Sequence, residues 1–180
     1  MDAATIMQII SNPISKKKVD GIAAESPGSA RDLIELSLHS NHEVAFRAAW
    51  ILEQIAFNLG PEFQKLVPEF IEAYLNLKNQ SCQRHYTKIL MCLSLPANIR
   101  YQLTNMDLEP VVCVTFQWLI DSDTPVAVRV NCMDILYNLR EQHDWIPDEL
   151  AAQIKFQMRN GSAALQSRGT RVLNRLLKRR

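Results

Sequence analysis

The stretch SNHEVAFRAAWIL at residues 40–52 joins a short polar turn, an arginine and an apolar pair within the span of one helix. Three later segments repeat this order of residue types, and each ends in a leucine. They are NQSCQRHYTKIL at 79–90, DSDTPVAVRVNCMDIL at 121–136 and NGSAALQSRGTRVL at 160–173, so the unit recurs every 37 to 46 residues. Helical hairpins that repeat at about 40 residues are typical of α-solenoids.

Helical periodicity extends on both sides of these turns. In residues 43–59, Val44, Ala48, Ile51 and Ile55 fall on one face of a helix. No segment shows sustained period-two alternation with β-branched residues, so we expect an all-α fold without a sheet. The other predicted helices cover residues 2–11, 15–25, 29–38, 61–75, 81–93, 96–105, 107–120 and 125–140, one opened by Pro147, and 162–178.

The sequence predicts a specific structural role for each of two residues near turns. Ser29 is expected to cap the helix that follows the break at residues 26–28. Pro68 is expected to lie inside the helix over 61–75 and to bend it, because proline removes one backbone hydrogen bond.

The composition places the chain among ordinary globular proteins. Its 180 residues suit one domain, and 47% of them are hydrophobic. No apolar run reaches the roughly 18 residues that cross a bilayer, and the amino terminus, MDAAT, lacks the features of a signal peptide. We therefore expect a cytoplasmic protein without a membrane segment. The four cysteines show no CxxC spacing and are expected to be reduced core thiols.

The order of helix, turn and helix resembles HEAT repeats, which are relatives of armadillo repeats. A HEAT unit has a first helix with an internal proline, a turn with Asp or Asn, and a Val-Arg start to a second helix that ends in leucine. Here LVPEFI at 66–71 precedes the turn at Asn79 and Arg84, and Asp121 precedes Val128-Arg129. The chain is most similar to small, bacterial-type cytosolic members of this group.

The resemblance covers residues 29–180 and implies a right-handed α-α superhelix of about four helical hairpins. Residues 1–28 are expected to form an N-terminal helical segment, within a single compact domain overall. Stacked hairpins share a continuous core, and their second helices line an extended groove.

Several side chains on the second helices are candidates for contacting a partner in this groove. The recurring arginines either bind an acidic ligand or hydrogen-bond the turns of their own repeats. Trp50 is either a binding hot spot or a packing residue. The candidate partner-binding residues are Arg47, Trp50, Arg84, Arg129, Arg171 and Arg175.

The sequence contains no recognisable catalytic, nucleotide-binding or metal-binding motif. It has no phosphate-binding glycine loop, no GxSxG and no HExxH. The pairs His39/His42 and Cys82/His85 each supply two ligands where zinc needs three or four. We therefore expect no catalytic residue, no metal and no cofactor, and a protein that is not an enzyme.

Charge is unevenly distributed, although the net charge is only +1. Residues 151–180 hold eight lysines and arginines and no acidic residue. Arg168, Arg171, Arg175 and Lys178 fall on one face of the last predicted helix, which is either a binding face or a solvated cap.

The main functional hypothesis is a non-enzymatic scaffold for protein–protein interaction, with an acidic peptide or protein surface as one candidate partner. The alternative is a nucleic-acid-binding or DNA-repair protein that uses the basic C-terminal helix, since the bacterial alkylpurine DNA glycosylases are HEAT-like enzymes. Self-association through an open end of the solenoid is a third hypothesis. The oligomeric state cannot be read from the sequence.

Overall fold

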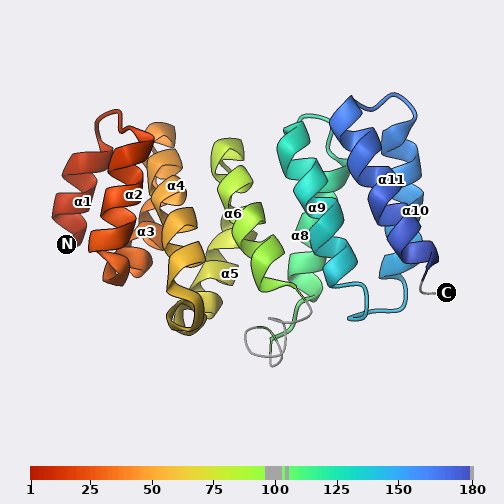
Figure 1. Cartoon of the computed structure of the whole chain (residues 1–180), viewed down its shortest axis with the longest axis horizontal. Helices are drawn as coiled ribbons and strands as arrows, with labels where there is room; N and C mark the ends of the chain where they lie inside the picture. The colour runs from red at the N-terminus through yellow and green to blue at the C-terminus, as the bar shows by residue number, and fades with distance from the viewer. Residues whose placement is uncertain (96–102, 104–105, 179–180) are drawn as a thin grey trace. The chain divides into compact units, whose positions relative to one another are not determined.

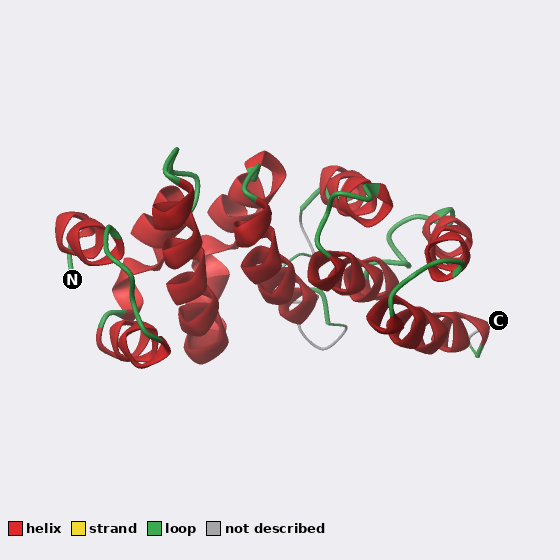
Figure 2. Ribbon diagram, turned by 90° about the horizontal axis from the view of Figure 1, so that it is seen from above, coloured by secondary structure: helices red, strands yellow, loops and turns green. Residues whose placement is uncertain are grey.

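The computed structural model describes residues 1–95, 103 and 106–178, with only the backbone described at 59–62. Within these ranges the chain is helical and contains no strand (Figures 1 and 2). The α-helices are α1 (Ala3–Ile10), α2 (Lys16–Glu25), α3 (Ala30–Leu36), α4 (His42–Leu59), α5 (Val67–Asn76), α6 (Gln80–Leu93), α8 (Glu109–Ile120), α9 (Val126–Asn138), α10 (Ile146–Met158) and α11 (Ala163–Leu177). Two 3-10 helices cover Pro27–Ser29 and Gly60–Leu66. The helix predicted over 96–105 lies outside the described residues.

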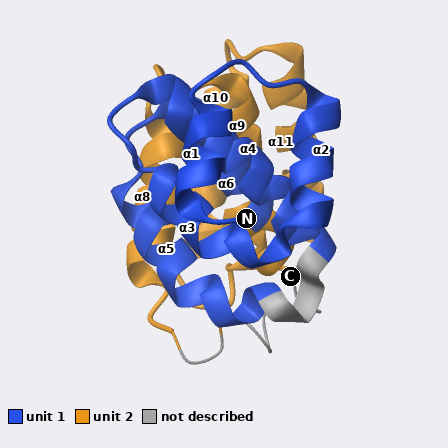
Figure 3. Ribbon diagram, turned by 90° about the vertical axis from the view of Figure 1, so that its left-hand side faces the viewer, with its two compact units in different colours: residues 1–89 blue, residues 90–180 orange. Residues whose placement is uncertain are grey.

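The chain forms two compact units, Met1–Ile89 and Leu90–Arg180, and the boundary falls within α6 (Figure 3). Unit 1 contains α1 to α5 and most of α6, whereas unit 2 contains the last residues of α6 and the helices α8 to α11.

Polar side chains precede and cap α1, α2 and α4. Asp2 Oδ1 accepts a hydrogen bond from the Thr5 amide at 2.8 Å, and Ser15 Oγ accepts one from the Lys18 amide at 3.3 Å. Asn41 Oδ1 accepts from the Glu43 amide at 3.0 Å before α4. These side chains satisfy amide groups that have no partner within the first turn of a helix.

Two expectations about turns are wrong. Pro68 lies in the first turn of α5, after the 3-10 helix Gly60–Leu66, and not inside a longer helix. The first turn is where a missing backbone amide costs least, because amides there have no intrahelical partner. Ser29 occupies the N-cap position of α3, but its side chain makes no capping hydrogen bond, since its hydroxyl instead donates to the carbonyl oxygen of Met1 at 3.1 Å.

The core of unit 1 is built around α4, which packs against α1, α2 and α3. An aromatic contact joins α5 to α6, because the rings of Phe70 and Tyr86 stack with centroids 4.8 Å apart. The Tyr86 hydroxyl lies 2.5 Å from Ser37 Oγ, beyond the end of α3. Burial raises the pKa of Tyr86, so this group stays neutral and able to donate.

The core of unit 2 is built around α9, which packs against α8, α10 and α11. Most of α9 is buried, including the polar residues Asn131, Asp134 and Asn138. Asn138 Nδ2 donates to Ser94 Oγ at 3.1 Å. Polar groups buried in this way need partners, and the partners of Asp134 form the site described below.

Gly169 allows α11 to approach α10 closely. A Cβ atom there would lie 2.6 Å from Met158 Sδ and 2.9 Å from the buried Ile154 Cγ2. Replacing a helical glycine with alanine ordinarily stabilises by about 0.5–1 kcal/mol. We expect Gly169→Ala instead to lower the free energy of unfolding by about 1–2 kcal/mol, since the side chain of Ile154 must shift. Thermal unfolding measures this effect. The matched control is Gly21→Ala, because open space surrounds that position. Equal stabilisation by both substitutions would contradict the close approach of α11 to α10.

Candidate functional site

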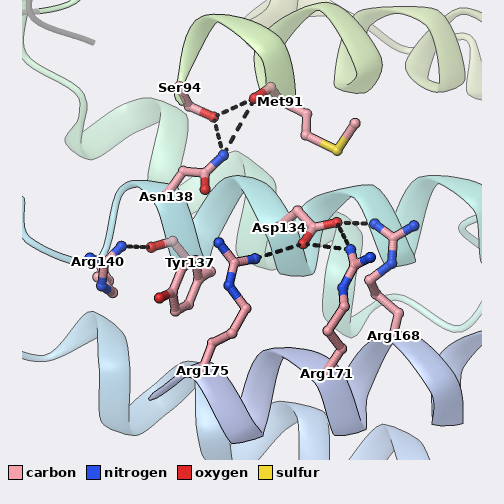
Figure 4. A network of polar contacts seen from close by, with 9 residues as sticks. All are labelled: Met91, Ser94, Asp134, Tyr137, Asn138, Arg140, Arg168, Arg171 and Arg175. Atoms are coloured by element: carbon pink, nitrogen blue, oxygen red, sulfur yellow. Dashed lines mark hydrogen bonds and ion pairs between the residues drawn. The ribbon is translucent and has the colours of Figure 1, made fainter. Parts of the chain in front are cut away.

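Three arginines on one face of α11 converge on a single carboxylate of α9, as Figure 4 shows. Arg168 Nη1 donates to Asp134 Oδ2. Arg171 Nη2 lies 3.2 Å from Asp134 Oδ1 and 3.1 Å from Oδ2, and Arg175 Nη1 lies 3.6 Å from Oδ1. We call Arg168, Arg171, Arg175 and Asp134 the arginine cluster.

The ring of Tyr137 extends the arginine cluster along α9. The Arg175 guanidinium lies 3.9 Å from the centre of this ring, and the Arg140 guanidinium lies 4.3 Å from it. Arg140 also donates to the Tyr137 carbonyl oxygen at 2.7 Å and pairs with Glu141 at 2.6 Å. Cations are attracted to the faces of aromatic rings, so the ring helps to hold both guanidinium groups in place.

The charges in the arginine cluster do not balance. The side chain of Asp134 is only 7% exposed and carries one negative charge, whereas Arg168, Arg171 and Arg175 carry three positive charges and are 27%, 56% and 42% exposed. Burial and the neighbouring charge of Arg171 lower the pKa of Arg168, although arginine stays charged at neutral pH. Solvent therefore meets a surface with an excess of positive charge, which favours an anionic ligand.

Unit 1 contains a second buried carboxylate, which is paired with a histidine and a lysine and not with arginines. Glu53 of α4 lies 2.5 Å from His85 Nδ1 and 2.8 Å from Lys88 Nζ, both on α6. Burial alone would raise the pKa of Glu53, but the hydrogen bonds from His85 and Lys88 outweigh it and the pKa is lowered. Glu53 is thus ionised at neutral pH and accepts from His85 Nδ1, which leaves the buried Nε2 without a partner among the described residues.

One family accounts for this arrangement of helices. The model of the HEAT repeat domain family matches residues 6–176, almost the whole chain. The chain belongs to the HEAT repeat family. No curated protein and no solved structure matches it.

This assignment confirms the predicted all-α, HEAT-type fold. The right-handed superhelix and the number of hairpins stay predictions. The division of the chain at residue 28 also stays a prediction.

The position of each arginine within its HEAT unit explains which ones face inward. Arg47 and Arg168 both lie five residues before the leucine that ends their segment, whereas Arg84 lies six and Arg129 seven residues before it. Each residue advances a helix by about 100°, from 3.6 residues per turn. His85 occupies in α6 the place that Arg168 occupies in α11, and both contact a buried carboxylate of an earlier helix.

The other candidate residues each have their own surroundings within their unit. In unit 1, Arg47 is 12% exposed and binds the carbonyl oxygen of Ile10 at 3.0 Å and Glu43 at 2.6 Å. Trp50 is half-buried, with its ring centroid 6.0 Å from that of Phe46, and Arg84 is exposed. In unit 2, Arg129 Nε donates to the carbonyl oxygen of Leu119 at 3.4 Å. Of the six candidates, the structure brings only Arg171 and Arg175 together on one partner.

Sequence reasoning missed the two carboxylates that organise these networks. Glu53 directly follows Ile51-Leu52, and Asp134 directly precedes Ile135-Leu136. An acidic residue beside the most buried pair of a helix is a signal of a paired charge, since an unpaired carboxylate is rarely buried. The partners themselves carry no comparable signal, because they lie more than 30 residues away.

The remaining potential metal ligands and nucleophiles do not form a cluster among the described residues. Over residues 1–95, 103 and 106–178, no three His, Cys, Asp or Glu side chains are grouped as a metal site. In the same ranges no helix is both long and apolar enough to span a membrane. No disulfide joins the four cysteines, which all lie in the described residues. Cys82 and Cys132 are buried as expected, whereas Cys92 is half-buried and Cys113 is exposed and is not a core thiol.

Proposed function

We propose that this HEAT repeat protein is a non-enzymatic scaffold that binds an acidic segment of another protein through the arginine cluster. The observation that supports it is the sharing of one buried carboxylate by three arginines, two of which are about half-exposed. A location in the cytoplasm is part of the proposal, and four cysteines without a disulfide fit a reducing compartment.

The geometry suits carboxylate ligands in particular. A guanidinium group presents several N–H donors in a plane, and it pairs with carboxylates through two parallel hydrogen bonds. Asp134 and the ring of Tyr137 hold Arg171 and Arg175 in place, so little side-chain entropy remains to be lost when a ligand binds. A glutamate- or aspartate-rich peptide is therefore the preferred probe.

The double variant Arg171→Glu/Arg175→Glu tests the proposal. We expect the affinity for a fluorescein-labelled polyglutamate peptide to fall at least about tenfold, as expected when like charges are placed opposite each other. Fluorescence anisotropy at low and moderate salt measures it. The matched control is Lys17→Glu/Lys18→Glu, which changes the net charge equally at two exposed positions of unit 1. An equal loss in both variants would mean that net charge, and not the arginine cluster, attracts the peptide.

Nucleic acid is the second candidate ligand, because residues 151–180 contain eight basic and no acidic residues. The same anisotropy assay with duplex and single-stranded DNA distinguishes it. Binding to phosphates releases counterions, so the affinity for DNA would fall steeply with salt. Tighter binding of DNA than of polyglutamate at moderate salt would favour the nucleic-acid function.

Trp50 and Arg84 of unit 1 stay proposed contacts of a partner. Arg47 and Arg129 are bound to backbone carbonyl oxygens, and we propose that they chiefly support the fold.

A further inference from the structure

A groove with a volume of about 1020 Å³ lies along α10 and α11 of unit 2. Its apolar lining comes from Leu173, Leu176 and Leu177 of α11 and from Ala151 and Ala152 of α10. These leucines lie at i, i+3 and i+4, and the side chain of Leu177 is 67% exposed. Small alanines opposite a leucine ridge leave room for another helix to pack.

The equivalent positions of the earlier second helices are buried. Leu173 and Leu176 of α11 correspond to Leu136 of α9 and to Leu139, which directly follows α9, and both are completely buried. In the same register, Leu90 and Leu93 of α6, and Leu52 and Ile55 of α4, are also buried. α9 packs against the two helices that follow it, α10 and α11. The groove on α11 is thus the edge that a following helix would cover.

The net charge of the groove changes sign along its length. Asp148, Ala151, Ala152 and Lys155 follow one face of α10 at i, i+3, i+4 and i+7. At the start of α10 the groove is also lined by Asp144 and by Glu141, whose charge is balanced by its pairing with Arg140 at 2.6 Å, so Asp144 and Asp148 make this end acidic. Lys155 lies at the other end. A helix bound here with its amino terminus over the acidic end would place the positive end of its dipole there.

We infer that this groove binds an amphipathic helix of a partner protein, with a leucine-type stripe, basic residues toward Asp144 and Asp148, and acidic residues toward Lys155. A second copy of this chain fits less well. The α11 helix of a second copy contains basic residues and no acidic residue, so it has no group to place opposite Lys155. The inference does not depend on the arginine cluster, because the groove recognises an apolar stripe and not a single anionic group.

Two synthetic peptides of about 16 residues, or about four helical turns, test the inference. Both carry leucines at helical spacing. The first has lysines at its amino end and glutamates at its carboxyl end, and the second has these charges exchanged. We expect the first to bind at least about threefold more tightly in fluorescence anisotropy, although its charges oppose its own helix dipole. In the variant Asp144→Lys/Asp148→Lys the preference should reverse, which a loss of folding cannot imitate.

Steric blockage of the groove provides the second measurement. Ala152 is exposed, so Ala152→Arg should fold normally while it weakens binding of the first peptide at least about tenfold. The matched control is Phe156→Glu, which alters an exposed residue of α10 outside the groove and should leave binding unchanged. Failure of both peptides to bind, or equal effects of the two variants, would overturn the inference. Self-association in sedimentation that Ala152→Arg abolishes would also overturn it, because a second copy would then be the occupant.

These tests are separate from those of the proposed function. Arg171→Glu/Arg175→Glu changes the arginine cluster and no residue that lines the groove, whereas Ala152→Arg changes the groove alone. Loss of polyglutamate binding in Arg171→Glu/Arg175→Glu, with binding of the first helical peptide retained, would therefore support the proposed function and leave the inference about the groove unaffected. A wild-type protein that binds the first peptide but not polyglutamate would count against the proposed function alone.

Discussion

Replacing Asp134 with alanine should lower the free energy of unfolding by about 2–3 kcal/mol. The change removes the only carboxylate that the arginine cluster contains and leaves Arg168, Arg171 and Arg175 facing one another. Removing one partner of a fully buried ion pair costs about 3–5 kcal/mol. We expect less here because Arg171 and Arg175 are about half-exposed and can turn toward water.

Urea unfolding at neutral pH measures this effect, and hydrogen exchange should localise it to α9 and α11. The control is Asp144→Ala, which removes an exposed acid of the same unit and should change stability by no more than about 0.5 kcal/mol. Equal effects of the two substitutions would mean that the cluster contributes nothing specific to stability.

The isosteric variant Asp134→Asn separates stability from binding. It removes the negative charge while keeping the size of the side chain, so the excess positive charge on α11 increases. We expect the affinity for polyglutamate to rise severalfold at low salt, even though the protein is less stable. A fall in affinity would show that Asp134 is needed to position the arginines.

Replacing Glu53 with glutamine should have the second large effect, a loss of about 2–3 kcal/mol at neutral pH. The side chain of Glu53 is only 5% exposed and accepts from both His85 and Lys88. The glutamine amide has one acceptor oxygen and an NH2 group, so one of these two donors would face another donor.

The pH dependence of the unfolding free energy shows whether the loss in Glu53→Gln comes from the charge of Glu53. Because the pKa of Glu53 is lowered from its ordinary value of 4.5, its contribution to stability is complete above about pH 4.5 and is lost as the pH falls through the folded-state pKa. The difference in unfolding free energy between the wild type and Glu53→Gln should therefore be constant near neutrality and shrink below pH 4.5.

The matched control for Glu53→Gln is Glu69→Gln in the same unit. Glu69 pairs with Arg31 at 2.8 Å, but both side chains are solvent-exposed, so this pair should contribute less than about 1 kcal/mol. A constant difference for Glu53→Gln down to pH 3 would contradict an ionised, stabilising carboxylate.

The sequence predicted local features well. The helices expected over 2–11, 15–25 and 43–59 begin within one residue of α1, α2 and α4. The residues that cap them, Asp2, Ser15 and Asn41, lie within one turn of these starts, so helix starts depend on local sequence. The expectation for Pro68 was wrong because the apolar periodicity runs through the 3-10 helix before it, and periodicity alone does not distinguish one long helix from two short ones.

The candidate site was predicted only in part. Arg171 and Arg175 were selected for their charge and spacing, and both belong to the arginine cluster. The recurring arginines near the starts of the second helices do not have equivalent surroundings. A shift of one or two residues turns a side chain by about 100° or 200° around the helix, so Arg84 is exposed while His85 is buried against Glu53.

The sequence by itself determined the helical class, the repeated hairpins, most helix boundaries and the excess of basic residues near the C-terminus. All of these depend on residue types within a few turns of helix. Only the tertiary structure decided that Asp134 gathers three arginines, that Glu53 joins His85 and Lys88, and that Leu173 and Leu176 line an open groove. Such features depend on which faces of distant helices meet, since burial and pairing are properties of the packed chain and not of the segment.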